Sequence, residues 1–166
     1  MGIDSNKGLL EIAVEKFGRE NNFSVKEKDL ILNLDSISGS FDMAVVFGVM
    51  HHLPSENIRN NFIKQAGGLV KNSGVLVLSF WEIENCKEVE IPGLSKSDLD
   101  SGDFFLAWKG DKDSVRYVHK YSLNEIENIC KLLAQEGFKL ESRFIDDFNS
   151  KSDNLYLVFR RTRLKK

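Results

Sequence analysis

The 166-residue sequence lacks the residues and motifs that mark several common protein classes. It has two cysteines, Cys86 and Cys130, far apart in the chain, so neither a disulfide framework nor a zinc cluster is expected. It has no apolar run of membrane-spanning length and no signal peptide after Met1, which favours a cytoplasmic protein without membrane contact. The motifs G-x-x-x-x-G-K-S/T, H-E-x-x-H, C-x-x-C and the nucleophile elbow are also absent, which argues against P-loop, hydrolase and redox chemistry.

The chain also has no large excess of positive or of negative charge. The formal net charge is −2, which gives no global reason to expect a nucleic-acid partner. The last seven residues, 160–166, contain five basic side chains, which fits either a solvated terminus or an RNA-contacting arm. With 42% apolar and 29% charged residues, the chain suits one globular domain with a hydrophobic core.

Apolar spacing and turn residues predict alternating strands and helices along the chain. Helices are expected over residues 9–17, with Ser5 or Asn6 as the cap, over 55–70, and over 122–137. Strands are expected at 2–4, 23–29, 43–47 and 75–80, followed by an antiparallel pair at 138–145 and 154–159. The continuous apolar character of 43–47 predicts a strand covered on both faces, and 72–74 reads as a turn.

The acidic segment 82–113 contains Pro92, several glycines and little periodicity. Loops of this length are uncommon inside compact domains and are often functional. We therefore treat 82–121 as an insertion or lid within a single domain of residues 1–166, although a mobile surface excursion is an equal alternative.

The segment 41–54, FDMAVVFGVMHHLP, is the most informative part of the chain. An apolar strand runs there into a loop with two histidines and then into a helix. Ligands of open α/β sheets bind beyond the carboxyl ends of strands, so a bound molecule is expected to touch residues 47–52. Adjacent histidines on extended backbone point in opposite directions and no third ligand is nearby in sequence, so no metal is expected. One ring is expected in the core and the other in the pocket.

The F-D-x-apolar-H-H-L arrangement at 41–53 resembles that of class I S-adenosylmethionine (SAM) dependent methyltransferases. The order of expected elements also resembles this family, from its second strand to its seventh. The resemblance implies an α/β, Rossmann-like sheet with a C-terminal antiparallel hairpin, and SAM as the cofactor. It also implies that the first strand, its glycine-rich turn and the first helix are missing, so that the domain is N-terminally truncated.

The segment 2–13, GIDSNKGLLEIA, resembles the second strand and following helix of the family. By this resemblance Asp4 takes the place of the acid that binds both ribose hydroxyls, although it could instead only cap the helix. Asp29 takes the place of the acid that accepts the adenine amino hydrogen. The cofactor-binding positions implied in this way are Asp4, Ser5, Asp29, Leu30, Phe47 and Gly48.

Two later segments resemble the tRNA wobble-uridine methyltransferases that esterify a carboxymethyl group. They are GDFFLAW at 102–108, where Ala107 replaces a proline, and RYVHKY at 116–121, where Val118 replaces a tyrosine. Arginine can pair with a phosphate or carboxylate and aromatic rings can stack on a splayed base, so these residue types suit a nucleotide. The resemblance implies Arg116 and His52 as catalytic residues and Trp108, Tyr117 and His119 as substrate contacts.

Several functions remain open at this point. Methylation of a modified uridine in tRNA is the first, with an inactive truncated chain as an open alternative. The alternatives are a SAM-dependent methyltransferase with a small-molecule acceptor and a non-catalytic remnant that binds RNA or a partner. A Rossmann-fold oxidoreductase comes last, because methyltransferases carry the antiparallel terminal hairpin that the sequence predicts.

Overall fold

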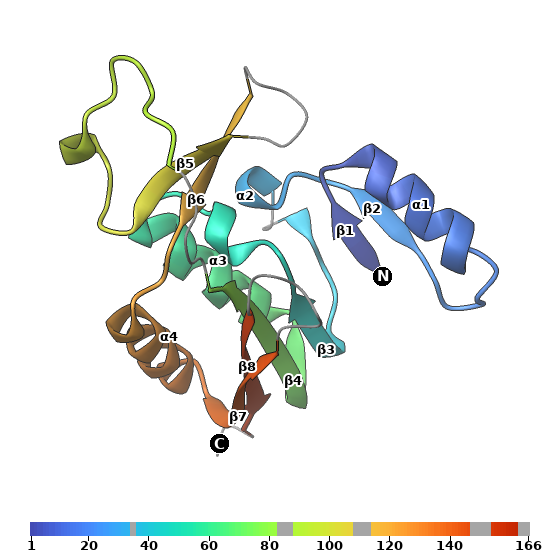
Figure 1. Cartoon of the computed structure of the whole chain (residues 1–166). Coiled ribbons are helices and arrows are strands. Elements are labelled where there is room, and N and C mark those ends of the chain that lie inside the picture. Colours follow the sequence, from blue (N-terminus) through green and yellow to red (C-terminus); the bar gives the residue numbers. More distant parts are fainter. Residues whose placement is uncertain (34–35, 83–87, 108–113, 147–153, 163–166) are drawn as a thin grey trace. The chain divides into compact units, whose positions relative to one another are not determined.

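The computed structural model describes residues 1–33, 36–82, 88–107, 114–146 and 154–162. The chain divides into two compact units, Met1–Ser38 and Gly39–Lys166, each with its own hydrogen-bonded sheet (Figure 1). No helix among the described residues is long and apolar enough to span a membrane.

The first unit is a parallel strand pair joined by a helix. Its elements are β1 (Gly2–Asp4), α1 (Lys7–Phe17), β2 (Val25–Glu27) and the short α2 (Leu30–Asn33). Asn6 caps α1 because its side chain accepts a hydrogen bond of 3.1 Å from the backbone N–H of Leu9. The predicted strand, capped helix and second strand are confirmed, whereas α2 was not expected.

The second unit contains a four-stranded mixed sheet. Its strands are β3 (Phe41–Val46), β4 (Val70–Trp81), β7 (Phe138–Asp146) and β8 (Asn154–Arg161), in the spatial order β3-β4-β8-β7. The pair β3 and β4 is parallel, and β8 runs antiparallel to both of its neighbours. The predicted antiparallel hairpin at the C-terminal end of the chain is therefore confirmed.

Two long helices pack against this sheet. They are α3 (Glu56–Gly68), capped by Ser55, and α4 (Leu123–Gln135), capped by Ser122 and Glu125 in a capping box. The core lies between them and the sheet face that carries Val46, Leu78 and Leu157, which are neighbours in register. The predicted helices at these positions are confirmed.

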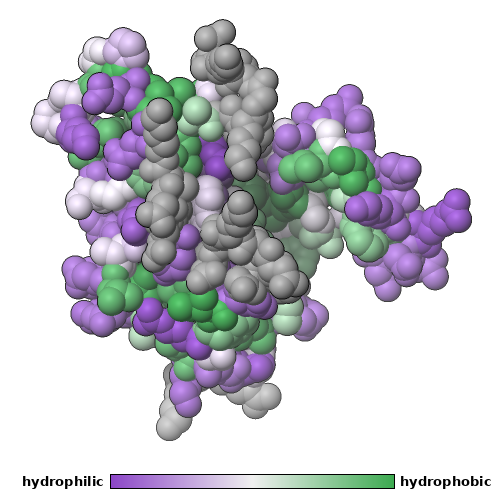
Figure 2. All heavy atoms as spheres, in the orientation of Figure 1, coloured by the Kyte–Doolittle hydropathy of each residue, from purple (hydrophilic) through white to green (hydrophobic). Residues whose placement is uncertain are grey.

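The strand at 43–47 was predicted to be covered on both faces, but in the structure one face of it is exposed. Met43, Val45 and Phe47 are 56%, 46% and 58% exposed. Alternation along a strand places these side chains opposite the face that packs on the helices, and both long helices described in this unit lie on that other face. Figure 2 shows apolar surface, drawn in green, reaching solvent on this unit.

The prediction of a turn at 72–74 was also wrong. These residues do not turn the chain but lie inside β4, where the register against β3 shifts and Ser73 has a φ of 66°. The segment 82–113, predicted as part of an insertion or lid, contains the short η3 turn (Lys96–Asp98) and β5 (Asp103–Ala107), a strand that was not expected. Strand β5 pairs antiparallel with β6 (Val115–His119) to form a two-stranded ribbon.

Candidate functional site

The loop after β3 leaves room for a ligand beside its backbone. Gly48 has a φ of 68°, and a Cβ atom built on it would meet no atom within 4 Å. Its N–H donates to the hydroxyl oxygen of Ser79 at 3.3 Å, which fixes the loop to the neighbouring strand β4. A left-handed glycine with open space beside it allows close approach of a bound molecule to the backbone. Phe47 precedes it and is exposed.

The two histidines lie on a single turn of 3₁₀ helix, η2 (Met50–His52), and not on extended backbone. Their rings therefore do not point in opposite directions, and the ring centroids are 4.2 Å apart. His51 is 8% exposed and its ring meets the edge of Trp81 with centroids 5.2 Å apart. Burial, together with the charges of His52 and Arg116, lowers the pKa of His51 to about 3, so its ring is neutral at ordinary pH.

His52 is half-buried and is held by the backbone of β6. Its Nδ1 atom lies 3.1 Å from the carbonyl oxygen of Tyr117. Burial lowers the pKa of His52, the hydrogen bond with Tyr117 opposes this, and the charge of Arg116 lowers it further. The expectation that one of the two rings lies in the core agrees with His51. The expectation that the other ring faces the substrate pocket stays a prediction for His52.

Arg116 lies in the same part of the second unit. The central carbon of its guanidinium group is 5.0 Å from the ring centroid of Trp81, in the geometry of a cation–π contact. Trp81 was not predicted as a site residue, although its position directly after the buried strand at 75–80 is a signal that could have identified it. The second unit thus brings together Arg116, Trp81, His51 and His52.

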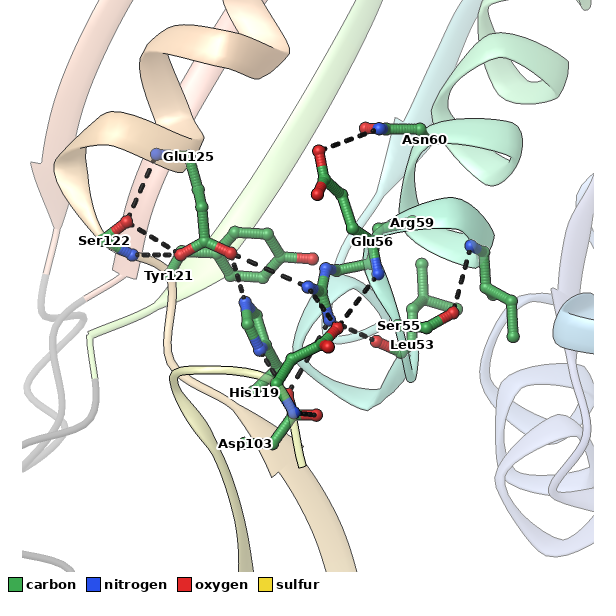
Figure 3. A network of polar contacts seen from close by, with 12 residues as sticks. Leu53, Ser55, Glu56, Arg59, Asn60, Asp103, His119, Tyr121, Ser122 and Glu125 are labelled. Carbon is green, nitrogen blue, oxygen red and sulfur yellow. Dashed lines mark hydrogen bonds and ion pairs between the residues drawn. The ribbon is translucent and has the colours of Figure 1, made fainter. Parts of the chain in front are cut away.

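A buried ionic cluster supports this arrangement (Figure 3). We call Arg59, Asp103, His119 and Glu125 the Arg59 cluster; they come from α3, β5, β6 and α4. The guanidinium of Arg59, which is 4% exposed, lies 3.8 Å from Asp103 and 3.7 Å from Glu125, and both ring nitrogens of His119 meet these carboxylates.

Hydrogen bonds also set the charge of Glu125 in this cluster. Burial alone would raise the pKa of Glu125, but hydrogen bonds from Ser122 and His119 outweigh it and lower the pKa. The Arg59 cluster was not predicted from the sequence. The signal that could have revealed it is Arg59 itself, a charged residue on the apolar stripe of α3 with Phe62 and Ile63.

Of the three residues predicted to contact the substrate, the structure describes Tyr117 and His119, which differ in burial. The ring of His119 is 0% exposed and belongs to the Arg59 cluster, with carboxylates on both of its nitrogens. The side chain of Tyr117 donates a hydrogen bond to Asp103, whereas its backbone carbonyl holds His52. Burial, followed by that hydrogen bond, raises the pKa of the Tyr117 hydroxyl. Trp108 lies outside the described residues.

In the first unit, Asp4 and Asp29 lie at the carboxyl end of the parallel strand pair. Asp4 ends β1, and the N–H of Lys28 donates to its carbonyl oxygen at 2.9 Å. One carboxylate oxygen of Asp4 accepts a bond of 2.8 Å from the N–H of Asn6, and one of Asp29 accepts a bond of 2.9 Å from Ile31. Both acids therefore shape local turns and share one sheet edge. Ser5 follows Asp4 directly, and Leu30 begins α2.

The segment predicted as an insertion or lid lines a cavity of its own. A cavity of about 1140 Å³ is lined by described residues between positions 88 and 105 and by Lys120. Neither this cavity nor a smaller one between α3 and α4 is lined by His52 or Arg116. The described residues contain no group of three or more His, Cys, Asp or Glu side chains placed to hold a metal ion.

Comparison with known proteins places the fold. No family model matches the chain. A protein of Encephalitozoon cuniculi that is provisionally named a methyltransferase is 23% identical over 128 residues, which are 77% of this chain. The chain spans 56% of the length of that relative.

Two solved structures are similar in three dimensions. A SAM-dependent methyltransferase of Methanosarcina mazei matches with a TM-score of 0.66 and 15% identity, over 97% of this chain and 81% of that one. The 1,6-didemethyltoxoflavin-N1-methyltransferase of Burkholderia thailandensis, solved with bound 1,6-didemethyltoxoflavin and S-adenosylhomocysteine, matches with a TM-score of 0.61 and 13% identity. That match covers 96% of this chain and 60% of that one. The chain therefore has the α/β, Rossmann-like fold of class I SAM-dependent methyltransferases, as the sequence predicted.

Proposed function

We propose that this chain carries out SAM-dependent methyl transfer and that its acceptor is a modified uridine in tRNA. The observation that carries the proposal is the arrangement in the second unit, where His52 follows β3, Trp81 ends β4, Arg116 lies in β6 over the ring of Trp81, and Gly48 leaves its backbone open. When bound, SAM supplies an activated methyl group on a sulfonium centre. The protein mainly has to align the acceptor and exclude water.

The chain's residues fit the cofactor on two counts. In the first unit, one carboxylate oxygen of Asp4 makes no hydrogen bond with described residues, so it can accept a ribose hydroxyl. Asp29 and Leu30 would contact the adenine, and Ser5 would lie beside the ribose. In the second unit, the open space at Gly48 and the exposed Phe47 suit contact with the sulfonium end.

The acceptor would be held through its charge and its ring. Arg116 would pair with a carboxymethyl carboxylate, which is already ionised near neutral pH and therefore needs no general base. Trp81 supports the guanidinium, and His52 shapes the neighbouring wall. Trp108, Tyr117 and His119 were expected to contact this acceptor. For Tyr117 and His119 we infer a positioning role instead, because their side chains meet Asp103 and Glu125.

The test is methyl transfer from isotopically labelled SAM by the full chain to tRNA that carries carboxymethyluridine, with tRNA that lacks the carboxymethyl group as the comparison. Arg116→Ala should reduce transfer much more than it reduces SAM binding, because the arginine would contact only the acceptor. Lys120→Ala, an exposed position next to the end of β6, is the matched control and should leave both unchanged. Equal losses of transfer and SAM binding in Arg116→Ala would contradict the proposal.

A small-molecule acceptor is the second candidate function. It is favoured by the structural similarity to the Burkholderia thailandensis enzyme, whose described acceptor is a small heterocycle. A chain that ignores tRNA but methylates a small acidic heterocycle would support this candidate. Binding of tRNA without SAM binding or methyl transfer would instead support the non-catalytic alternative.

A further inference from the structure

The hydrogen bond between His52 and β6 fixes which ring nitrogen of His52 carries a proton. The Nδ1 atom lies 3.1 Å from the backbone carbonyl oxygen of Tyr117. A carbonyl oxygen can only accept a hydrogen bond, so Nδ1 must be the donor. In the neutral ring the other nitrogen, Nε2, then carries a lone pair.

The surroundings keep this ring neutral. Burial and the charge of Arg116 lower the pKa of His52, and its neighbour His51 is neutral for the same reasons. No described residue makes a hydrogen bond to Nε2 of His52. The imidazole therefore presents an acceptor whose partner does not come from the described part of the chain, and an unmatched acceptor in a half-buried place favours a ligand that can donate.

The same place also carries a positive charge and a flat apolar surface. The ring of Trp81 contacts both the guanidinium of Arg116 and the ring of His51, whose centroid is 4.2 Å from that of His52, so the arginine lies near both histidines. The charge of Arg116 lowers the pKa of both histidines. A simple carboxylate would complement the charge of Arg116 but would place its own lone pairs against that of His52. A molecule with both an anionic group and an N–H or O–H group complements the charge of Arg116 and the lone pair of His52 together.

We propose that Nε2 of His52 accepts a hydrogen bond from an N–H or O–H group of the methyl acceptor while Arg116 pairs with an anionic group of the same molecule. The inference rests on the proposed function only in naming the bound molecule as the methyl acceptor. A uracil ring with an acidic side arm meets both conditions through its imide N–H and its carboxylate. An acceptor that is only an anion, or only a cation, does not.

The proton position is tested by nitrogen-15 NMR of the histidine rings in the full chain near neutral pH. Its three histidines can be assigned by His51→Asn and His52→Asn. The expected result for His52 is a neutral ring protonated on Nδ1 with an unprotonated Nε2. A ring protonated on Nε2, or on both nitrogens, would overturn the inference without any reference to catalysis.

Recognition of the donor group is tested by calorimetry with two probes, 5-carboxymethyluridine and its N3-methyl analogue, which keeps the anion and lacks the N–H. The full chain should bind the first about tenfold more tightly, the ratio for loss of one hydrogen bond. His52→Asn keeps a donor near the Tyr117 carbonyl but lacks Nε2, and His52→Phe keeps the bulk of the ring but lacks the lone pair. Both should abolish the preference.

Arg116→Gln is the matched control because it should weaken both probes by the same factor and keep the preference. A preference for 5-carboxymethyluridine that survives in His52→Phe would have a steric cause. Equal binding of the two probes by the unchanged chain, or binding of neither, would show that the site does not recognise the N–H donor. Either result overturns the inference. The expected tautomer and preference in a chain that transfers no methyl group to tRNA would refute the proposed function alone.

Discussion

Replacement of His51 by asparagine is expected to make the stability of this chain less sensitive to acid. His51 is buried beside Trp81, and its pKa is lowered from 6.5 to about 3 by burial and by the charges of His52 and Arg116. As the pH falls below 6.5, the unfolded chain binds a proton at this position and the folded chain does not. The neutral ring therefore contributes stability above its unfolded pKa that is lost as the pH falls.

The size of the effect follows from the same shift. Each pH unit below the unfolded pKa removes about 1.4 kcal/mol until the folded pKa is reached, so at about pH 5 the loss is about 2 kcal/mol. At about pH 7.5 the contribution of His51 to the pH dependence is close to zero. Any loss of packing in His51→Asn is present at both pH values and cancels in the difference between them.

The assay is urea unfolding followed by circular dichroism at about pH 7.5 and about pH 5, for the unchanged chain and for His51→Asn. The variant should lose about 2 kcal/mol less than the unchanged chain between the two conditions. His52→Asn is the matched control and should remove a smaller part of the difference, because His52 is only half-buried and a backbone hydrogen bond opposes its shift. Identical pH dependence in His51→Asn and the unchanged chain would refute the argument from burial.

Three further changes test the rest of the molecule. Arg59→Met should destabilise the chain by about 3 to 5 kcal/mol because it leaves the buried carboxylate of Asp103 without its arginine, whereas Lys71→Met, in an exposed pair with Asp42, should change stability by less than about 1 kcal/mol. Similar losses for the two in urea unfolding would show that the Arg59 cluster is not a buried network. Ser122→Ala removes the cap of α4 and should cost about 1 kcal/mol in the same assay, and no loss would show that the box does not stabilise the helix. Asp4→Ala should weaken SAM binding by about 1.5 to 3 kcal/mol in calorimetry, and unchanged affinity would count against the ribose assignment.

Much of the fold could be predicted because its signals are local. The box formed by Ser122 and Glu125 fixes the start of α4 through groups three residues apart, and the short apolar run in 154–159, with its aromatic and β-branched residues, marks a strand without knowledge of its partner. The strand β5 was missed because its ladder joins Asp103 to His119, and an aperiodic acidic segment gives no sign of a partner that distant.

The candidate site divides in the same way. The sequence by itself determined that Gly48, His51 and His52 follow a strand of an α/β sheet and that Asp4 and Asp29 follow the two strands before it, because strand ends are encoded by nearby residues. Only the tertiary structure decided that the histidines share one 3₁₀ turn, that the carbonyl of Tyr117 selects the tautomer of His52, and that Trp81 lies under Arg116. It also placed His119 inside the Arg59 cluster. The contacts of His52 with Tyr117 and of Trp81 with Arg116 join residues dozens of positions apart, and the chain must fold before burial and hydrogen bonding can act on them.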